Sequence, residues 1–433
     1  MFSVLASKWL QTGYELPLYE QTQGDSLERT FYTGLLVIGT IVLLRRGQKV
    51  SRLLGRNIPI VLFFIYCAAS VLWSDYPDVA FKRWIKALGD LVMVLIVLTD
   101  NDPLGAIKRL LSRTGFLLIP SSILLIRYYP FLGRDWKVDG RPVFVGVTSD
   151  KNALGVLCLI FGLGAGWRLL NGLREQKPPP PPNRRSFLAQ GVLFTMVMWL
   201  FWVANSMTAF SSFALALGLM VATSFPFIRR NRPAVHLLVF AMLALAVLPL
   251  FLSVGASVLG ELGRDATLTG RTTLWKQLIG MNPSMLVGAG FESFWLGPRI
   301  QTLWSMKEFQ YHPNEAHNGY LETYLNLGWV GVVVFASVIA AGYRNALAAL
   351  RRDPQLGMLS LSYVLTGIIY SFTEAGFRLL NPVWFFFLMA AMMLPKSPAR
   401  RPAAATAPLA PAVLAELYPV HHTASPERFA RHG

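Results

Sequence analysis

The feature that most constrains this chain is a series of eleven apolar runs separated by short polar segments. About 20 apolar residues in a helix suffice to cross the hydrocarbon core of a bilayer. Hydrophobic residues make up 54% of the chain and charged residues 15%, against roughly 25% charged residues in soluble domains. So much apolar surface does not fit into one soluble core, and the sequence predicts an all-α, polytopic helical membrane protein. The runs lie at 31–45, 58–73, 82–99, 115–128, 152–170, 187–204, 208–227, 234–254, 327–346, 357–373 and 380–394.

Basic residues are distributed unevenly between the segments that join these runs. One alternating set holds more than half of the 40 Lys and Arg residues. Cytoplasmic loops of membrane proteins carry such an excess, so this set is predicted to be cytoplasmic, with the N-terminus outside and the C-terminus inside. The net charge of +17 is then explained mostly by the orientation of the chain in the membrane, and a nucleic-acid partner is not expected. The set comprises 45–56, 108–113, 174–185, 228–232, 344–352 and the C-terminal tail.

These patterns divide the chain into five parts. Several runs are shorter than about 20 residues, so about 11 transmembrane helices (10–12) are predicted and one short run could be re-entrant. The parts are an N-terminal periplasmic or interfacial segment (1–30), transmembrane helices 1–8 (31–254), a large periplasmic loop (255–326), transmembrane helices 9–11 (327–394) and a disordered cytoplasmic tail (395–433).

The long outer segment 255–326 is the predicted place of the chemistry, because long loops in compact proteins are usually functional. It contains TLTGRTTLW (267–275), GAGFESFW (288–295) and HPNEAHNGYLE (312–322). Aromatic side chains of this kind suit the membrane interface, and their faces can also stack against sugar rings.

Two of these motifs resemble a known family. GRT followed by Trp, together with HNGYLE in the same loop, is similar to the O-antigen ligase and polysaccharide polymerase superfamily. TLTGRTTLW and the KN-x-LG segment at 151–155 are most similar to its ExoQ-like exopolysaccharide-production branch, and WSDYPDVAFKRW (73–84) resembles the family's pattern before the third span. The resemblance implies a metal-independent glycosyltransferase of the bacterial inner membrane, without a cofactor. It would transfer glycan from undecaprenyl pyrophosphate to an acceptor hydroxyl on the outer face, with inversion.

A pyrophosphate leaving group calls for fixed cations, and the planar guanidinium of Arg binds phosphate oxygens bidentately. Arg271 of the GRT motif is the first candidate. Arg83, with Lys82, is the second, because basic residues at an outer span end oppose the positive-inside trend; snorkelling to lipid headgroups would explain them equally well. Further outer cations that could complete a pyrophosphate funnel are Arg141, Lys151, Arg264 and Arg378.

The acceptor hydroxyl needs a base or proton relay, and a His with a pKa near 6.5 can serve at neutral pH. His317, which opens HNGYLE, is the candidate; His312 precedes a proline in the loop and is not expected to be catalytic. No third ligand is spaced with these two His residues, so no metal is predicted. Asn318 would help the chain turn tightly beside a ligand.

Two acidic residues complete the predicted site. Glu322 could cap the following helix or hold a donor sugar. Glu374 resembles an acidic position of the family, and it could instead pair with Arg378 at i+4. One departure from the family pattern is Met207, where a basic residue is usual, so a phosphate contact is missing or supplied elsewhere, for example by Lys151.

Three functions remain open on the sequence. A polymerase of lipid-linked repeat units is favoured, with an O-antigen ligase that uses a lipid or protein acceptor as the nearest alternative. A non-catalytic scaffold or a transporter in polysaccharide export is the third. The expected partners are an undecaprenyl-pyrophosphate-linked glycan, an acceptor glycan, membrane lipid, a lipid flippase and chain-length or export proteins.

Overall fold

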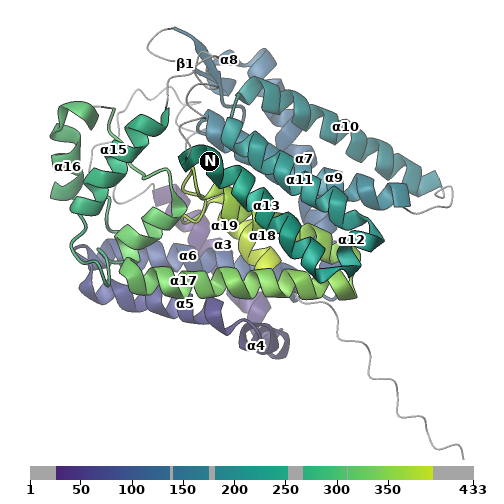
Figure 1. Cartoon of the computed structure of the whole chain (residues 1–433), viewed down its shortest axis with the longest axis horizontal. Coiled ribbons are helices and arrows are strands. Elements are labelled where there is room, and N and C mark those ends of the chain that lie inside the picture. Colours follow the sequence, from purple (N-terminus) through teal and green to yellow (C-terminus); the bar gives the residue numbers. More distant parts are fainter. Residues whose placement is uncertain (1–25, 137–139, 175–180, 252–266, 310, 394–433) are drawn as a thin grey trace, which may run out of the picture. The chain divides into compact units, whose positions relative to one another are not determined.

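The computed structural model describes residues 26–136, 140–174, 181–251, 267–309 and 311–393 (Figure 1). Nearly all of this part is helical. Its two short strands, β1 (Arg134–Trp136) and β2 (Pro142–Phe144), pair antiparallel with Asp135 opposite Val143. The predicted helical class is therefore confirmed. The predicted N-terminal segment up to residue 25 and the tail from 394 lie outside the described residues.

Each of the eleven apolar runs corresponds to a helical stretch of the described chain. These stretches are α3 (Ser26–Leu44), α5 with η1 (Ile58–Ala69, Ser70–Trp73), α6 (Pro77–Leu98), α7 (Pro103–Tyr128), α9 (Lys151–Arg174), α10 (Pro181–Ala204), α11 (Met207–Ser224), α13 (Arg232–Phe251), α17 (Gly319–Arg352), α18 (Pro354–Tyr370) and α19 (Pro382–Met392). The remaining elements are α4 (Gly47–Gly55), α8 (Pro130–Gly133), α12 (Pro226–Arg230), α15 (Thr267–Gly280), α16 (Pro298–Ser305) and η2 (Lys307–Phe309).

Among the described residues, five helices are long and apolar enough to cross a membrane. They are α7, α9, α11, α17 and the Arg184–Ala204 part of α10; α3 and α4, bent by 94°, would add a sixth if they form one span. Other apolar helices are shorter, at Ile58–Trp73, Arg232–Leu248 and Pro382–Met392. A multi-pass membrane protein is thus supported, and the count of eleven crossings stays a prediction.

Sequence-local signals explain where the helices begin. Pro occupies the first turn of α5, α6, α7, α18 and α19, where its missing N–H is not needed. Asp102, Asp353 and Asn381 accept hydrogen bonds from backbone N–H groups of the helices that follow them. These caps satisfy donors that a helix start leaves unpaired.

The core is centred on α9, which packs against α7, α10, α11, α18 and α19. In Figure 1, α9, α10 and α11 lie side by side. Polar side chains on two of these helices bond to backbone carbonyls: Trp167 Nε1 donates to Gln355 O at 2.8 Å, and Tyr363 Oη to Ile160 O at 2.9 Å. Buried polar groups need such partners, and these two bonds fix α9 against α18.

Two contacts between loops each join loops that were predicted to lie on the same side of the membrane. In the basic set, Lys49 Nζ donates to Asn101 Oδ1 at 2.8 Å. In the other set, Arg299 Nη2 lies 2.8 Å from Asp75 Oδ2. Such contacts are required if successive loops alternate between the two sides of a bilayer. Which set is cytoplasmic stays a prediction.

The segment 371–381, between α18 and α19, is non-helical and reaches into the helical body. The helix α19 has only 11 residues and is about 16 Å long, shorter than a hydrocarbon core about 30 Å thick. Leu380 N, in the segment before it, donates to the buried Asp90 Oδ2 on α6 at 3.2 Å.

Candidate active site

Three segments far apart in the sequence bring Arg271, His317 and Glu374 together. Arg271, on α15, donates through Nη1 to Thr373 O at 2.6 Å, and its Nη2 lies 3.3 Å from Glu374 Oε1. His317 Nδ1 lies 3.1 Å from the other oxygen, Glu374 Oε2. One buried carboxylate therefore holds the two residues that the sequence proposed as catalytic, Arg271 and His317.

The turn before α17 explains how His317 reaches this carboxylate. His317 has a φ of 48°, a left-handed conformation that reverses the chain. Asn318, whose backbone is extended, then caps α17 by accepting from Tyr320 N and Leu321 N; its contact with a ligand stays a prediction. Gly319 N donates to Ser371 O at 2.8 Å and to Glu374 O at 3.1 Å, so the start of α17 is bonded directly to the 371–381 segment.

Glu322 holds the segment just before His317 in place through hydrogen bonds. Its carboxylate is buried and accepts from Trp295 Nε1 at 2.9 Å and from Ala316 N at 2.6 Å. The capping role considered for it belongs to Asn318. Because its oxygens are engaged with the GAGFESFW segment and with the residue before His317, Glu322 fixes the position of the His317 turn.

A second carboxylate, Glu315, flanks His317 and was missed in the sequence. His317 Nδ1 lies 2.8 Å from Glu315 Oε1, and Arg378 Nη1 lies 3.4 Å from Glu315 Oε2. Arg378 Nε also lies 3.7 Å from Glu292 Oε2. Glu374 and Arg378 therefore do not form the i+4 pair considered above: Glu374 pairs with Arg271 and His317, and Arg378 pairs with Glu292 and Glu315. The sequence did offer a signal for this role, because Glu315 lies two residues before His317 in HPNEAHNG.

Arg83, on α6, contacts one of these acidic residues. Its Nη1 donates to the backbone carbonyl of Glu292, the residue whose carboxylate pairs with Arg378. Glu292 has a φ of 53°, a backbone conformation that is uncommon for residues other than glycine. The ion pairs therefore run from Arg271 to Glu292, and Arg83 bonds to the backbone of that last residue.

The two carboxylates decide the protonation of His317. Burial alone would lower its pKa, but the hydrogen bonds and charges of Glu315 and Glu374 outweigh burial and raise the pKa to about 9. Burial would likewise raise the pKa of Glu315, and the bonds and charges of His317 and Arg378 instead lower it. At neutral pH His317 is therefore an imidazolium, and not the base titrating near 6.5 that its residue type suggested.

The same residues could supply metal ligands. One donor atom each from Glu315, His317 and Glu374 lies within 4.8 Å of the others, a set that differs from the His312 and His317 pair considered in the sequence. Both carboxylates, however, already face Arg271 or Arg378. A metal ion would have to displace these cations and the proton of His317.

The other predicted cations are not joined to this cluster by any contact described above, and their roles stay predictions. Lys82 is exposed beside Arg83, and Arg141 is exposed just before β2. Lys151 begins α9, and the next residue, Asn152, accepts a hydrogen bond from Ser206 Oγ at 3.4 Å. The start of α9 thus lies beside the turn that carries Met207, which keeps Lys151 as the predicted substitute. Arg264 lies outside the described residues.

Parts of the chain are similar in sequence to known proteins. Residues 183–336, about a third of the chain, match the O-antigen ligase family. A curated relative, the exopolysaccharide production protein ExoQ of Rhizobium meliloti (strain 1021), is 26% identical over 324 residues, which cover 71% of this chain and 69% of the relative. Together the two matches confirm the resemblance of this chain to the O-antigen ligase superfamily and to its ExoQ-like exopolysaccharide-production branch.

Proposed function

We propose that this chain is a membrane glycosyltransferase that polymerises undecaprenyl-pyrophosphate-linked repeat units into an exopolysaccharide on the periplasmic face of the inner membrane. The observation that carries the proposal is the pairing of Arg271 and His317 on the single carboxylate of Glu374. Such a pair fixes two cations at one end of a helical membrane body, where an anionic leaving group would bind.

The proposed reaction is a single displacement. The acceptor oxygen forms a bond to the anomeric carbon, the bond from that carbon to pyrophosphate breaks, and the electron pair leaves with the pyrophosphate. Attack opposite the leaving group inverts the anomeric centre. Arg271 and the His317 imidazolium stabilise the charge that grows on the leaving oxygens, which is usually a large catalytic term.

The proton of the acceptor hydroxyl needs a destination. In the resting cluster His317 is already protonated, so the carboxylates of Glu315 and Glu374 are the proton acceptors within the described cluster. The acceptor proton therefore ends on one of these carboxylates, and the Nδ1–H of the His317 imidazolium, which contacts both of them, holds them in place. This assignment replaces the simple His base expected from the sequence.

A complementation experiment tests this function with a matched pair of variants. His317 and His312 both have a left-handed φ, 48° and 52°, which Asn tolerates best among ordinary residues. In a strain deleted for the gene, wild type and His312→Asn should restore long polymer, because His312 is exposed and packs its ring on Trp304. His317→Asn, at equal membrane expression, should leave single repeat units.

The size and linkage of the surface glycan separate the alternatives. Full-length polymer that is no longer attached to its acceptor in the deletion strain would identify a ligase. Full restoration by His317→Asn would overturn the catalytic assignment and favour a scaffold.

Removal of divalent metal is expected to leave the activity unchanged. Arg271 and Arg378 already pair with the carboxylates of Glu374 and Glu315, so a divalent ion would have to displace them, and the proposed reaction uses side-chain cations in its place. Polymerisation by purified protein in EDTA should match the untreated rate. A loss that Mg²⁺ or Mn²⁺ restores would instead assign Glu315, His317 and Glu374 as metal ligands.

A further inference from the structure

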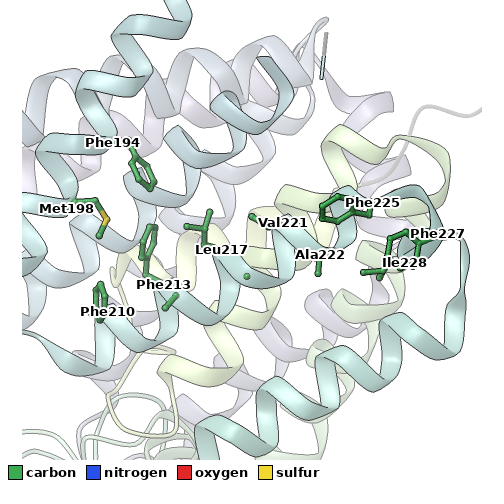
Figure 2. A pocket seen from close by; sticks show the side chains of 12 residues that line it. Phe194, Met198, Phe210, Phe213, Leu217, Val221, Ala222, Phe225, Phe227 and Ile228 are labelled. Carbon is green, nitrogen blue, oxygen red and sulfur yellow. The ribbon is translucent and has the colours of Figure 1, made fainter. Parts of the chain in front are cut away.

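Three acidic residues are buried in the described part of the chain, Asp90, Glu322 and Glu374. Glu322 and Glu374 belong to the candidate active site, whereas the proposed reaction makes no use of Asp90, which lies on α6. A groove of about 820 Å³ beside α11, by contrast, is lined by apolar residues throughout (Figure 2). An ionisable group buried in a predicted span is costly and is usually retained for function, so Asp90 is a candidate for a role of its own.

The side chain of Asp90 contacts the non-helical segment 371–381. Its Oδ2 accepts a hydrogen bond from Leu380 N at 3.2 Å, and it has no other hydrogen-bond or ion-pair partner among the described residues. Leu380 has a φ of 57°. A residue with a side chain adopts this left-handed conformation at a cost in free energy, and it persists where the surrounding structure holds it. Asp90 therefore holds a strained residue near the end of the segment.

The two halves of the segment are bonded to different helices. Near its start, Gly319 N on α17 donates to Ser371 O at 2.8 Å and to Glu374 O at 3.1 Å. Near its end, Leu380 N donates to Asp90 on α6. Loss of the second bond therefore leaves the bonds of the first half in place.

The second half brings Arg378 to the site. Arg378 lies two residues before Leu380, with its Nε 3.7 Å from Glu292 Oε2 and its Nη1 3.4 Å from Glu315 Oε2. Glu315 Oε1 in turn lies 2.8 Å from His317 Nδ1. If the backbone at Leu380 moves, Arg378 moves with it, and the carboxylate beside His317 loses its second cation.

Helix α6 also holds the other partner of Arg378. Arg83 lies seven residues before Asp90 on α6, which is about two helical turns, so the two side chains share one face. Arg83 Nη1 donates to Glu292 O, and Glu292 likewise has a left-handed φ of 53°. Each of these two side chains therefore holds one left-handed residue, and Arg378 is joined to both of those residues, to Leu380 through the chain and to Glu292 through an ion pair.

We propose that Asp90 is a positioning residue, whose side-chain oxygen holds Leu380 and thereby places Arg378 against Glu315. The inference rests on the proposed function, because it takes Glu315 and His317 to act in glycosyl transfer. What Asp90 supplies is a hydrogen-bond acceptor at a fixed point. The amide oxygen of Asn can replace it, whereas Leu fills a similar space without an acceptor.

The test measures kcat and KM of the purified full chain with radiolabelled lipid-linked repeat units. Asp90→Leu should lower kcat by about 10²-fold, the loss expected when a reacting group is misplaced by about 1 Å. The KM for the donor should change less than about twofold, because Arg271 and Glu374 stay in place. Asp90→Asn should retain most of the wild-type kcat. The control is Gln190→Leu, since Gln190 is a buried polar residue of α10 that bonds to Ser112.

A double-mutant cycle identifies the residue through which Asp90 acts. Arg378→Gln should lower kcat, and adding Asp90→Leu to it should lower kcat no further, whereas Gln190→Leu should leave kcat unchanged in either background. The inference is overturned if Asp90→Leu keeps the wild-type kcat, if Asp90→Asn loses as much as Asp90→Leu, or if the losses from Asp90→Leu and Arg378→Gln multiply. If His317→Asn polymerises at the wild-type rate, the proposed function itself is wrong.

Discussion

Changing Arg271 to Lys is expected to lower kcat/KM for polymerisation by about 10²–10³-fold, the loss typical of removing one preorganised donor from a developing anion. Arg271 uses one nitrogen for Thr373 O and another for Glu374, and its planar fork still presents further N–H groups to a phosphate. A Lys ammonium keeps the charge but cannot hold these contacts together. The measurement is the initial rate with radiolabelled lipid-linked donor at equal protein.

The matched control is Arg299→Lys. Arg299 is also a part-buried arginine in an ion pair, with Asp75 at 2.8 Å, and it lies over the ring of Phe294. Arg299 pairs with Asp75 and not with Arg271, His317 or Glu374, so Arg299→Lys should alter the rate only slightly. Equal small effects at both positions would mean that Arg271 acts only through its charge.

The sequence predicted the helices well because a hydrophobic run is a local property. Each run corresponds to a helix, but α17 begins at Gly319, eight residues before the run that predicted it. Asn318 caps the helix there, and Glu322 and Asn326 are buried with their own hydrogen-bond partners. Hydropathy does not detect helical turns that are covered by protein.

The kink in α17 has a similar origin. Gly328 has a φ of 63°, and an added Cβ there would lie 2.2 Å from the backbone of Leu286. Only glycine allows the 285–287 segment to approach so closely, with Trp329 N bonded to Met285 O at 2.9 Å. This contact between distant segments has no counterpart in the local pattern.

The candidate site was predictable only in part. Arg271 and His317 stand in motifs that can be read in the sequence, whereas Glu315 and Glu292 gain their roles from partners on other segments. The pair Glu374 and Arg378 was considered on helical spacing. The segment 371–381 is not helical, and Leu380 has a φ of 57°, so the spacing rule does not apply there.

Changing Glu374 to Gln is expected to lower the polymerisation rate by about 10²-fold, within the range for loss of a group in proton transfer. The amide keeps the shape of the side chain and leaves the backbone bond from Gly319 N to Glu374 O intact. It removes the charge that orients both Arg271 and His317. Glu308→Gln, at an exposed position on η2, is the control for loss of an acidic charge and should retain the wild-type rate.

The pH profile of Glu374→Gln provides a second readout that a general loss of fold would not give. In wild type the pKa of His317 is raised from 6.5 to about 9, so the stabilisation from its ion pairs is fully present below pH 6.5 and is lost as the pH rises through about 9. Activity that depends on the imidazolium should decline over the same interval. In Glu374→Gln only Glu315 supports the charge, so the decline should begin at lower pH. The prediction fails if rates measured between about pH 6 and 10 show the same alkaline limb in both proteins, because His317 would then not titrate under the control of Glu374.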